Sequence, residues 1–138
     1  MKRLLLADHN AFTRRLVRNF LTLSGDWEIC AEAADGNEAV EKAKVSHPDV
    51  AILDIAMPGL NGIEAARKIV ESSPETAALT ISMSDPNVVP DRLMQAGVRG
   101  FVSKYRLASE LVPAIEALLE GKTYFAVPNR NPLDVGWT

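Results

Sequence analysis

Four short apolar runs of the sequence each end at a residue that could take part in chemistry. These residues are Asp8, Asp54, Ser82 and Lys104. Short apolar runs separated by helical patterns are typical of buried parallel strands, and ligands on such sheets bind at the carboxyl ends of the strands. We therefore expect two carboxylates, one hydroxyl and one ammonium group to meet at one edge of a sheet. This set of groups suits the binding of a divalent cation together with a phosphoryl group.

The elements that must position these residues alternate along the chain. The hydrophobic pattern predicts strands at 4–7, 27–33, 50–54, 78–82 and 99–102 and helices at 11–23, 37–46, 61–72, 87–96 and 107–120. Right-handed crossovers between such units give an α/β fold with a doubly wound, five-stranded parallel sheet. Chain order alone does not fix strand order. The order 2-1-3-4-5 would place Asp8 and Asp54 on opposite sides of a crevice.

Helical spacing and proline positions predict how two of the helices are built. One apolar stripe of the first helix, which predicts its core side, consists of Phe12, Leu16, Phe20 and Leu23. If the last helix begins near Ser109, Pro113 lies just past its first turn and removes a hydrogen bond. We therefore expect a short kink or a later start of that helix.

Length and composition favour a single domain at 1–121. The 138 residues suffice for one core, and 122–138 has no periodicity, which indicates a tail or the start of a linker rather than another element. The net charge is −3 with dispersed Lys and Arg, which argues against nucleic-acid binding. Asp8 interrupts the first apolar run, which is too short for a signal peptide or membrane span. The single Cys30 cannot form an internal disulfide, which favours a cytoplasmic location.

Three segments of the sequence together resemble one known family. They read AEAADGNEA at 31–39, LDIAMPGLNG at 53–62 and GVRGFVSK at 97–104. They are similar to the receiver domain of bacterial two-component response regulators, the CheY-like fold, and most of all to the NarL/FixJ group. The resemblance covers residues 3–121. It implies the strand order 2-1-3-4-5. It also implies a cytoplasmic regulatory module that takes part in phosphorelay signal transduction and is not a free-standing enzyme.

The resemblance assigns the cation and the phosphoryl group to particular positions. Asp54 matches the aspartate that accepts a phosphoryl group from a histidine kinase. Asp8 matches the first acid of the family's metal-binding pair, and the backbone carbonyl of Ala56 matches a further ligand to Mg²⁺. His9 stands where the family has its second, directly metal-binding aspartate. Magnesium prefers oxygen ligands, so this change predicts weaker metal binding, with imidazole ligation by His9 as an alternative.

The same comparison implies a switch and a signalling surface. Ser82 matches the hydroxyl that bonds a phosphoryl oxygen, Lys104 the lysine that pairs with the phosphate, and Phe101 the aromatic residue that reorients with it. The surface formed by the predicted helix 87–96, strand 99–102 and helix 107–120 would then change shape and control an output, with transcription regulation as the expected one. A homodimer through this surface is a family expectation.

Several alternatives stay open at this point. The change at His9 allows a pseudo-receiver that signals without phosphate, and the chain could also be a standalone receiver. An aspartate-nucleophile phosphatase has a second acid two residues after the nucleophile, where this chain has Ala56. A flavodoxin-like flavin carrier needs a phosphate cradle that the segment after Asp8 lacks. Ala56 cannot orient a water molecule by a side-chain hydrogen bond, which predicts slow self-dephosphorylation of Asp54.

Overall fold

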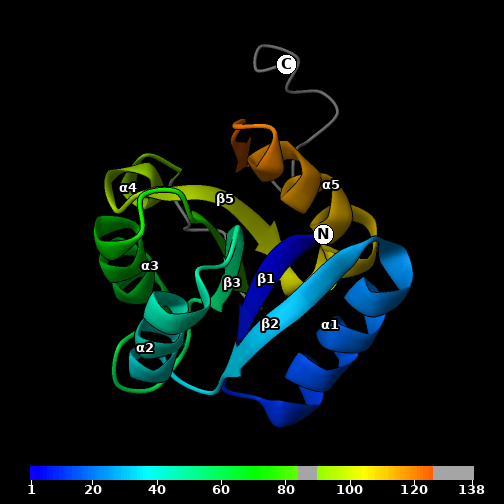
Figure 1. Cartoon of the computed structure of the whole chain (residues 1–138), viewed down its shortest axis with the longest axis horizontal. Helices are drawn as coiled ribbons and strands as arrows, with labels where there is room; N and C mark the ends of the chain where they lie inside the picture. The colour runs from blue at the N-terminus through cyan, green and yellow to red at the C-terminus, as the bar shows by residue number, and fades with distance from the viewer. Residues whose placement is uncertain (84–89, 126–138) are drawn as a thin grey trace.

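The sheet has six parallel strands in the order β2-β1-β3-β4-β5-β6 in the computed structural model, which describes residues 1–83 and 90–125 (Figure 1). β1 spans Lys2–Ala7, β2 Trp27–Ala33, β3 Val50–Asp54, β4 Ala77–Ser82, β5 Val98–Ser103 and β6 Tyr124–Phe125. The first five strands lie in the predicted order 2-1-3-4-5, and the fold class is confirmed. β3 is buried at every position, which is why its sequence is a continuous apolar run.

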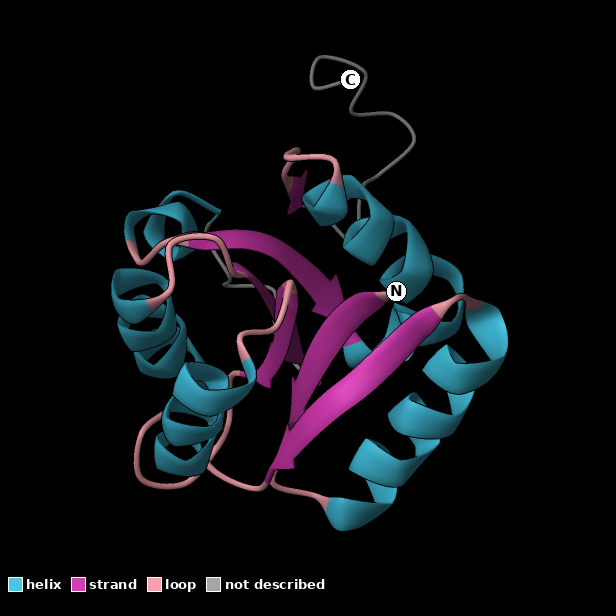
Figure 2. Cartoon of the chain, viewed as in Figure 1, coloured by secondary structure: helices cyan, strands magenta, loops and turns pink. Residues whose placement is uncertain are grey.

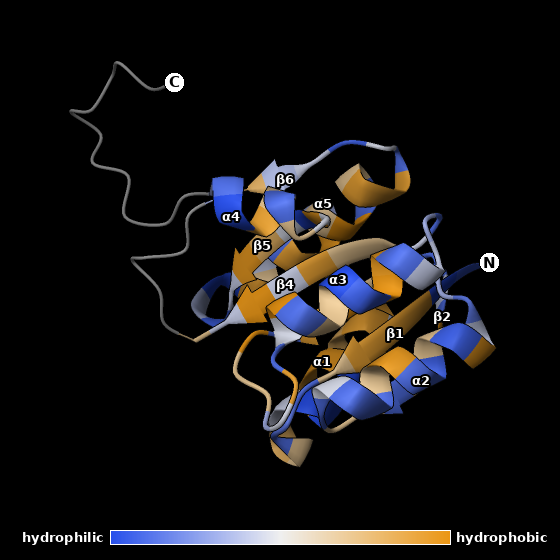
Figure 3. Ribbon diagram, turned by 90° about the vertical axis from the view of Figure 1, so that its left-hand side faces the viewer, coloured by the Kyte–Doolittle hydropathy of each residue, from blue (hydrophilic) through white to orange (hydrophobic). Residues whose placement is uncertain are grey.

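In the part of the chain that the structure describes, five α-helices cover the two faces of this sheet (Figure 2). α1 spans Ala11–Ser24, α2 Gly36–Ser46, α3 Gly62–Ser72, α4 Pro90–Gln95 and α5 Leu107–Leu119, and a short 3-10 helix, η1, covers Lys104–Arg106. α1 and α5 pack on one face, and α2, α3 and α4 pack on the other, each group with its own apolar cluster. Figure 3 shows the apolar strands behind the amphipathic helices α2 and α3. No helix described in 1–83 and 90–125 is long and apolar enough to cross a membrane.

The predicted helix boundaries agree with the structure to within a few residues where the structure describes them. The sequence predicts the fourth helix from residue 87. α4 begins at Pro90 in the structure, and residues 87–89 lie outside the described residues. Gly97 and Gly121 follow α4 and α5 with φ of 89° and 82°, the left-handed conformation that ends a helix. Asn61 caps α3 by accepting a hydrogen bond from the backbone N–H of Glu64.

The predicted core side of α1 is wrong at three of its four positions, and only Phe20 packs against the core. Three residues of the predicted stripe are exposed, namely Phe12 (67%), Leu16 (53%) and Leu23 (88%). The sheet instead contacts Val17 and Leu21, which are both buried. α1 carries apolar residues on two sides, so its periodicity alone cannot say which side faces the sheet. The position of the helix beside α5 decides it, because α1 and α5 share one apolar cluster.

Pro113 does not delay the last helix. α5 begins at Leu107 and continues through Pro113 to Leu119, so the expectation of a later start is wrong. Pro113 is exposed, and so is Ser109, the residue four positions earlier whose carbonyl loses its N–H partner. Water can donate a hydrogen bond to this carbonyl at the surface. The helix therefore accommodates Pro113 with a smaller loss of folding free energy than at a buried position.

A sixth strand follows α5 in a segment where the sequence predicts no further element. In β6, Tyr124 and Phe125 pair with Gly100 and Phe101 of β5. The prediction of no further element is thus wrong for these two residues, because a two-residue strand is too short to show a periodicity. Burial and the nearby carboxylate of Glu110 raise the pKa of the Tyr124 hydroxyl, in keeping with its packing against the edge of α5.

Candidate functional site

The four residues singled out by type and spacing lie at the carboxyl ends of the parallel strands. Asp8 follows β1, Asp54 ends β3, Ser82 ends β4 and Lys104 follows β5. Asp8 is completely buried, and Asp54 and Ser82 are 4% and 7% exposed. The Lys104 side chain is 8% exposed. The fold therefore places ionisable side chains in a region where water screens their charges only weakly.

Lys104 lies between the two carboxylates. Its Nζ is 2.7 Å from Asp8 Oδ2 and 3.2 Å from Asp54 Oδ2. Asp8 Oδ2 is buried, and its contact with Lys104 is the shorter of these two ion pairs. Two carboxylates and one ammonium leave a formal charge of −1 at this point. The site keeps a net attraction for a cation.

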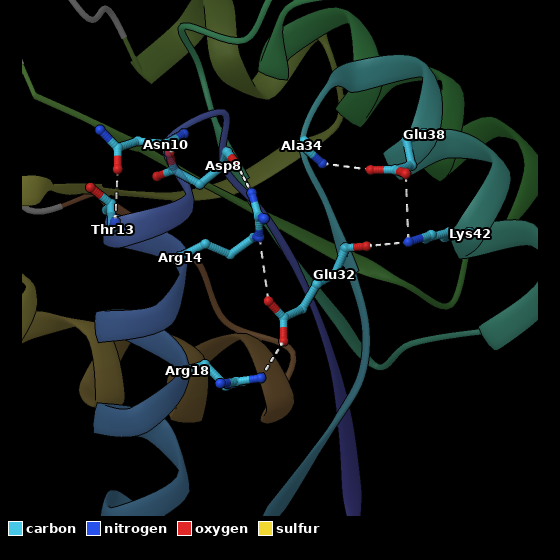
Figure 4. Close-up of polar contacts among 9 residues, drawn as sticks. All are labelled: Asp8, Asn10, Thr13, Arg14, Arg18, Glu32, Ala34, Glu38 and Lys42. Atoms are coloured by element: carbon cyan, nitrogen blue, oxygen red, sulfur yellow. Dashed lines mark hydrogen bonds and ion pairs between the residues drawn. The ribbon is translucent and has the colours of Figure 1, made fainter.

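Backbone groups fix both carboxylates from the other side. The N–H of Asn10 donates to Asp8 Oδ1 at 2.8 Å, and the N–H of Ala56 donates to Asp54 Oδ1 at 3.2 Å. The second oxygen of each carboxylate is thereby turned toward Lys104. Asn10 also caps α1 by accepting a hydrogen bond from Thr13, so the turn between β1 and α1 is defined by its own sequence (Figure 4).

A polar network behind Asp8 was not identified from the sequence. Arg14 Nη1 donates to the backbone carbonyl of Asp8 at 2.7 Å, and Arg14 Nε lies 3.4 Å from Glu32 (Figure 4). Glu32 also contacts Arg18 at 3.2 Å, and its backbone carbonyl accepts a hydrogen bond from Lys42 at 2.6 Å. This network joins β1, α1, β2 and α2. It holds the Asp8 backbone in place, and only the tertiary structure brings its members together.

The remaining predicted residues lie around this centre in different environments. His9 and Ala56 are exposed, whereas Phe101 is buried within β5. His9 does not complete a metal cluster, since the described residues contain no group of three or more His, Cys, Asp or Glu side chains that could hold a metal ion. Magnesium commonly keeps several waters and uses one or two carboxylates. Asp8 and Asp54, two buried carboxylates at the ends of neighbouring strands, are therefore compatible with such an ion.

Comparison with known proteins identifies the family to which this geometry belongs. The family model described as the response regulator receiver domain matches residues 4–116. The chain belongs to this family. The receiver domain is a regulatory, non-enzymatic domain of two-component systems, and it implies a cognate histidine kinase. Receiver domains typically bind Mg²⁺.

The similar proteins include transcriptional regulators of the NarL/LuxR group. The chain is 32% identical over 126 residues to the response regulator UvrY of Escherichia coli, covering 91% of this chain and 58% of UvrY. It is 31% identical over 126 residues to the response regulator GacA of Pseudomonas viridiflava, covering 91% and 59%. A crystal structure of a LuxR-family two-component response regulator from Aurantimonas sp. superposes with a TM-score of 0.85 at 32% identity, covering 91% and 89%. This receiver domain spans about 60% of the length of the curated relatives.

Proposed function

We propose that this receiver domain accepts a phosphoryl group on Asp54 from a histidine kinase and thereby controls an output, transcription regulation. The observation that carries the proposal is the position of the Asp54 carboxylate, which shares Lys104 with Asp8 at distances of 3.2 and 2.7 Å. A phosphoryl acceptor needs a carboxylate nucleophile and a nearby cationic group, and Asp54 and Lys104 are these groups here. Residues 1–121 together with β6 would form the receiver unit, and the residues after 125 would belong to a tail or to the start of a linker.

The transfer needs few protein groups. An Asp54 carboxylate oxygen attacks phosphorus, the P–N bond of the kinase phosphohistidine breaks, and the departing imidazole nitrogen takes up a proton. Lys104 balances charge on the phosphoryl oxygens, and Ser82 at the neighbouring strand end would donate a hydrogen bond to one of them. Asp8, Asp54 and the carbonyl of Ala56 would hold Mg²⁺, which supplies further charge neutralisation when bound.

The exposed His9 gives this domain a weaker cation site than a receiver with an aspartate at that position. An imidazole removes one negative charge and one oxygen ligand from the edge of the sheet. His9 itself would remain solvent-facing rather than bind the metal. We therefore infer that phosphorylation requires a higher magnesium concentration than in such a receiver.

The switch would act through packing. Once Asp54 carries a phosphoryl group, Ser82 would move toward it, and Phe101 on β5 would turn and change the surface of α4, β5 and α5. Phe101 has no hydroxyl group, so only its shape and apolar contacts can transmit the change. A homodimer through this surface is the expected consequence in the active state.

Phosphorylation by a small phosphodonor tests the proposal. The purified chain is incubated with phosphoramidate at increasing magnesium concentrations, and the intact mass is measured for wild type and Asp54→Asn. We expect one phosphoryl group on the wild type only, dependent on magnesium. An unmodified wild type at every magnesium concentration would refute the proposal. That result would support a pseudo-receiver, which the exposed His9 and the two-carboxylate site also favour.

A further inference from the structure

The short strand β6 lies against the strand that carries Phe101. β6 pairs with β5 in parallel, and Phe125 is the register partner of Phe101. Side chains of paired residues in neighbouring parallel strands project from the same face of the sheet. The two phenyl rings are therefore neighbours on the face that α2, α3 and α4 cover.

Burial supports this pairing. Phe101 is 4% exposed and belongs to the apolar cluster that contains Leu93 and Ala96 at α4. Phe125 is partly buried against the same cluster, whereas Tyr124 packs against the cluster on the opposite face. The two side chains of β6 thus lie on opposite faces of the sheet, as expected for a strand. Phe125 packs with the cluster around Phe101.

The backbone around Gly100 allows β6 to approach closely. A side chain at Gly100 would place its Cβ 3.0 Å from the carbonyl oxygen of Tyr124 and 2.8 Å from Leu79 Cδ1. The chain reaches this position through Gly121, whose carbonyl accepts a hydrogen bond from Arg99 Nη2 at 2.8 Å. Since β6 pairs at only two positions, its attachment to β5 depends strongly on the packing of its two aromatic side chains.

We propose that Phe125 is a positioning residue for Phe101 and that β6 is an element through which movement of Phe101 reaches the chain beyond residue 125. Phe101 cannot turn without altering the packing of Phe125, and a two-residue ladder is released when that packing is lost. The coupling of the two rings follows from their register and burial. Its use in signalling rests on the proposed function, in which Phe101 moves when Asp54 is phosphorylated.

Chymotrypsin cleavage under native conditions tests the coupling without any phosphorylation. Cleavage after Tyr124 or Phe125 requires release of β6, and cleavage after the exposed Tyr105 serves as an internal reference in the same mass spectra. We expect Phe101→Ala, and to a lesser degree the milder Phe101→Leu, to raise the rate at β6 at least tenfold relative to Tyr105. Phe101→Tyr, which keeps the ring, should retain the wild-type rate.

Leu21→Ala is the matched control for general destabilisation. Leu21 is buried on α1 in the opposite cluster, against which Tyr124 packs but Phe125 does not. The Leu21→Ala variant should keep the ratio of the cleavage rate at β6 to the cleavage rate at Tyr105 near the wild-type value. Equal ratios in wild type, Phe101→Ala and Phe101→Leu would overturn the coupling, as would an equal rise in Leu21→Ala and Phe101→Ala.

A second measurement separates the coupling from the proposed function. Wild type and Asp54→Asn are treated with phosphoramidate and magnesium, and intact mass and β6 cleavage are followed in the same samples. Faster β6 cleavage in phosphorylated wild type alone supports the inference. Unchanged cleavage in a sample whose mass carries the phosphoryl group overturns the role of β6 in signalling. A mass without the phosphoryl group counts against the proposed function instead, and the Phe101 variants then decide the coupling.

Discussion

At the level of single residues, His9 is the position where this chain departs from the acidic pair that the family resemblance implies. The imidazole is exposed, and the edge of the sheet keeps two carboxylates, Asp8 and Asp54, with Lys104 between them. Affinity for hard divalent cations follows the number of charged oxygen ligands. Under the proposed function, we therefore expect the residue at position 9 to affect how strongly this receiver domain competes with water for magnesium.

His9→Asp is expected to raise the affinity for Mg²⁺ by about tenfold, equivalent to about 1.4 kcal/mol, because it adds a carboxylate beside the existing two. Calorimetric titration of the unphosphorylated protein with MgCl₂ measures the change. His9→Asn, which removes the imidazole without adding charge, is the control and should stay within a factor of about three of wild type. Equal affinities for the aspartate and asparagine variants would contradict the charge argument.

Lys104→Met is expected to lower the free energy of unfolding by about 3 kcal/mol, because it leaves two buried carboxylates without their counter-ion. Urea unfolding in magnesium-free buffer measures the loss. The same substitution in a chain that also carries Asp8→Asn and Asp54→Asn should cost less than about 1 kcal/mol, since no buried charge is then left unpaired. An equal loss in both backgrounds would mean that Lys104 acts only through packing.

Ala56 lies two residues after Asp54 and is exposed at the site. Its methyl group cannot hold an attacking water molecule, so phosphorylated Asp54 should lose its phosphoryl group slowly, over minutes or longer. Ala56→Asn offers a side-chain amide that can hydrogen-bond the attacking water. This variant should lose the phosphoryl group about tenfold faster, because one hydrogen bond contributes about 1 kcal/mol. Decay of labelled phosphate in the presence of magnesium measures both rates. A wild-type half-life of seconds contradicts the prediction.

At the level of elements, α5 tolerates a proline that an isolated helix would not. Pro113→Ala restores one backbone donor in the middle of α5 and should raise the free energy of unfolding by about 1–2 kcal/mol. The full helical preference of alanine over proline is about 3 kcal/mol, and the greater freedom of the unfolded chain offsets part of it. Pro74→Ala, outside any helix and exposed, should change stability by less than about 0.5 kcal/mol. Urea unfolding compares the two, and a loss of stability in Pro113→Ala would count against a continuous α5.

At the level of the whole molecule, β6 extends the folded unit beyond Gly121. A fragment of residues 1–121 should be less stable than one of residues 1–125 by about 2 kcal/mol, because it lacks the two partly buried aromatic side chains of β6. Both fragments are compared by urea unfolding, with the full chain carrying Tyr124→Ser and Phe125→Ser as the matched control. That control should fall to the stability of the shorter fragment. Equal stability of both fragments would show that β6 contributes no net stability.

The sequence by itself determined the alternation of strands and helices and the residues that end the strands. These features depend on local rules, namely apolar runs and helical spacing. Because parallel strands present their carboxyl ends at one edge, the positions of Asp8, Asp54, Ser82 and Lys104 followed from the pattern alone. The distances of 2.7 and 3.2 Å to Lys104 confirm the proximity of three of them.

Only the tertiary structure decided which side of each element faces its neighbours. α1 has apolar residues on two sides. Val17 and Leu21 pack against the sheet, whereas Phe12 and Leu16 stay exposed. The contact of Glu32 with Arg14 and the pairing of Phe125 with Phe101 join positions 18 and 24 residues apart in sequence. Local periodicity carries no information about such contacts, because they exist only once the crossovers have placed the elements side by side.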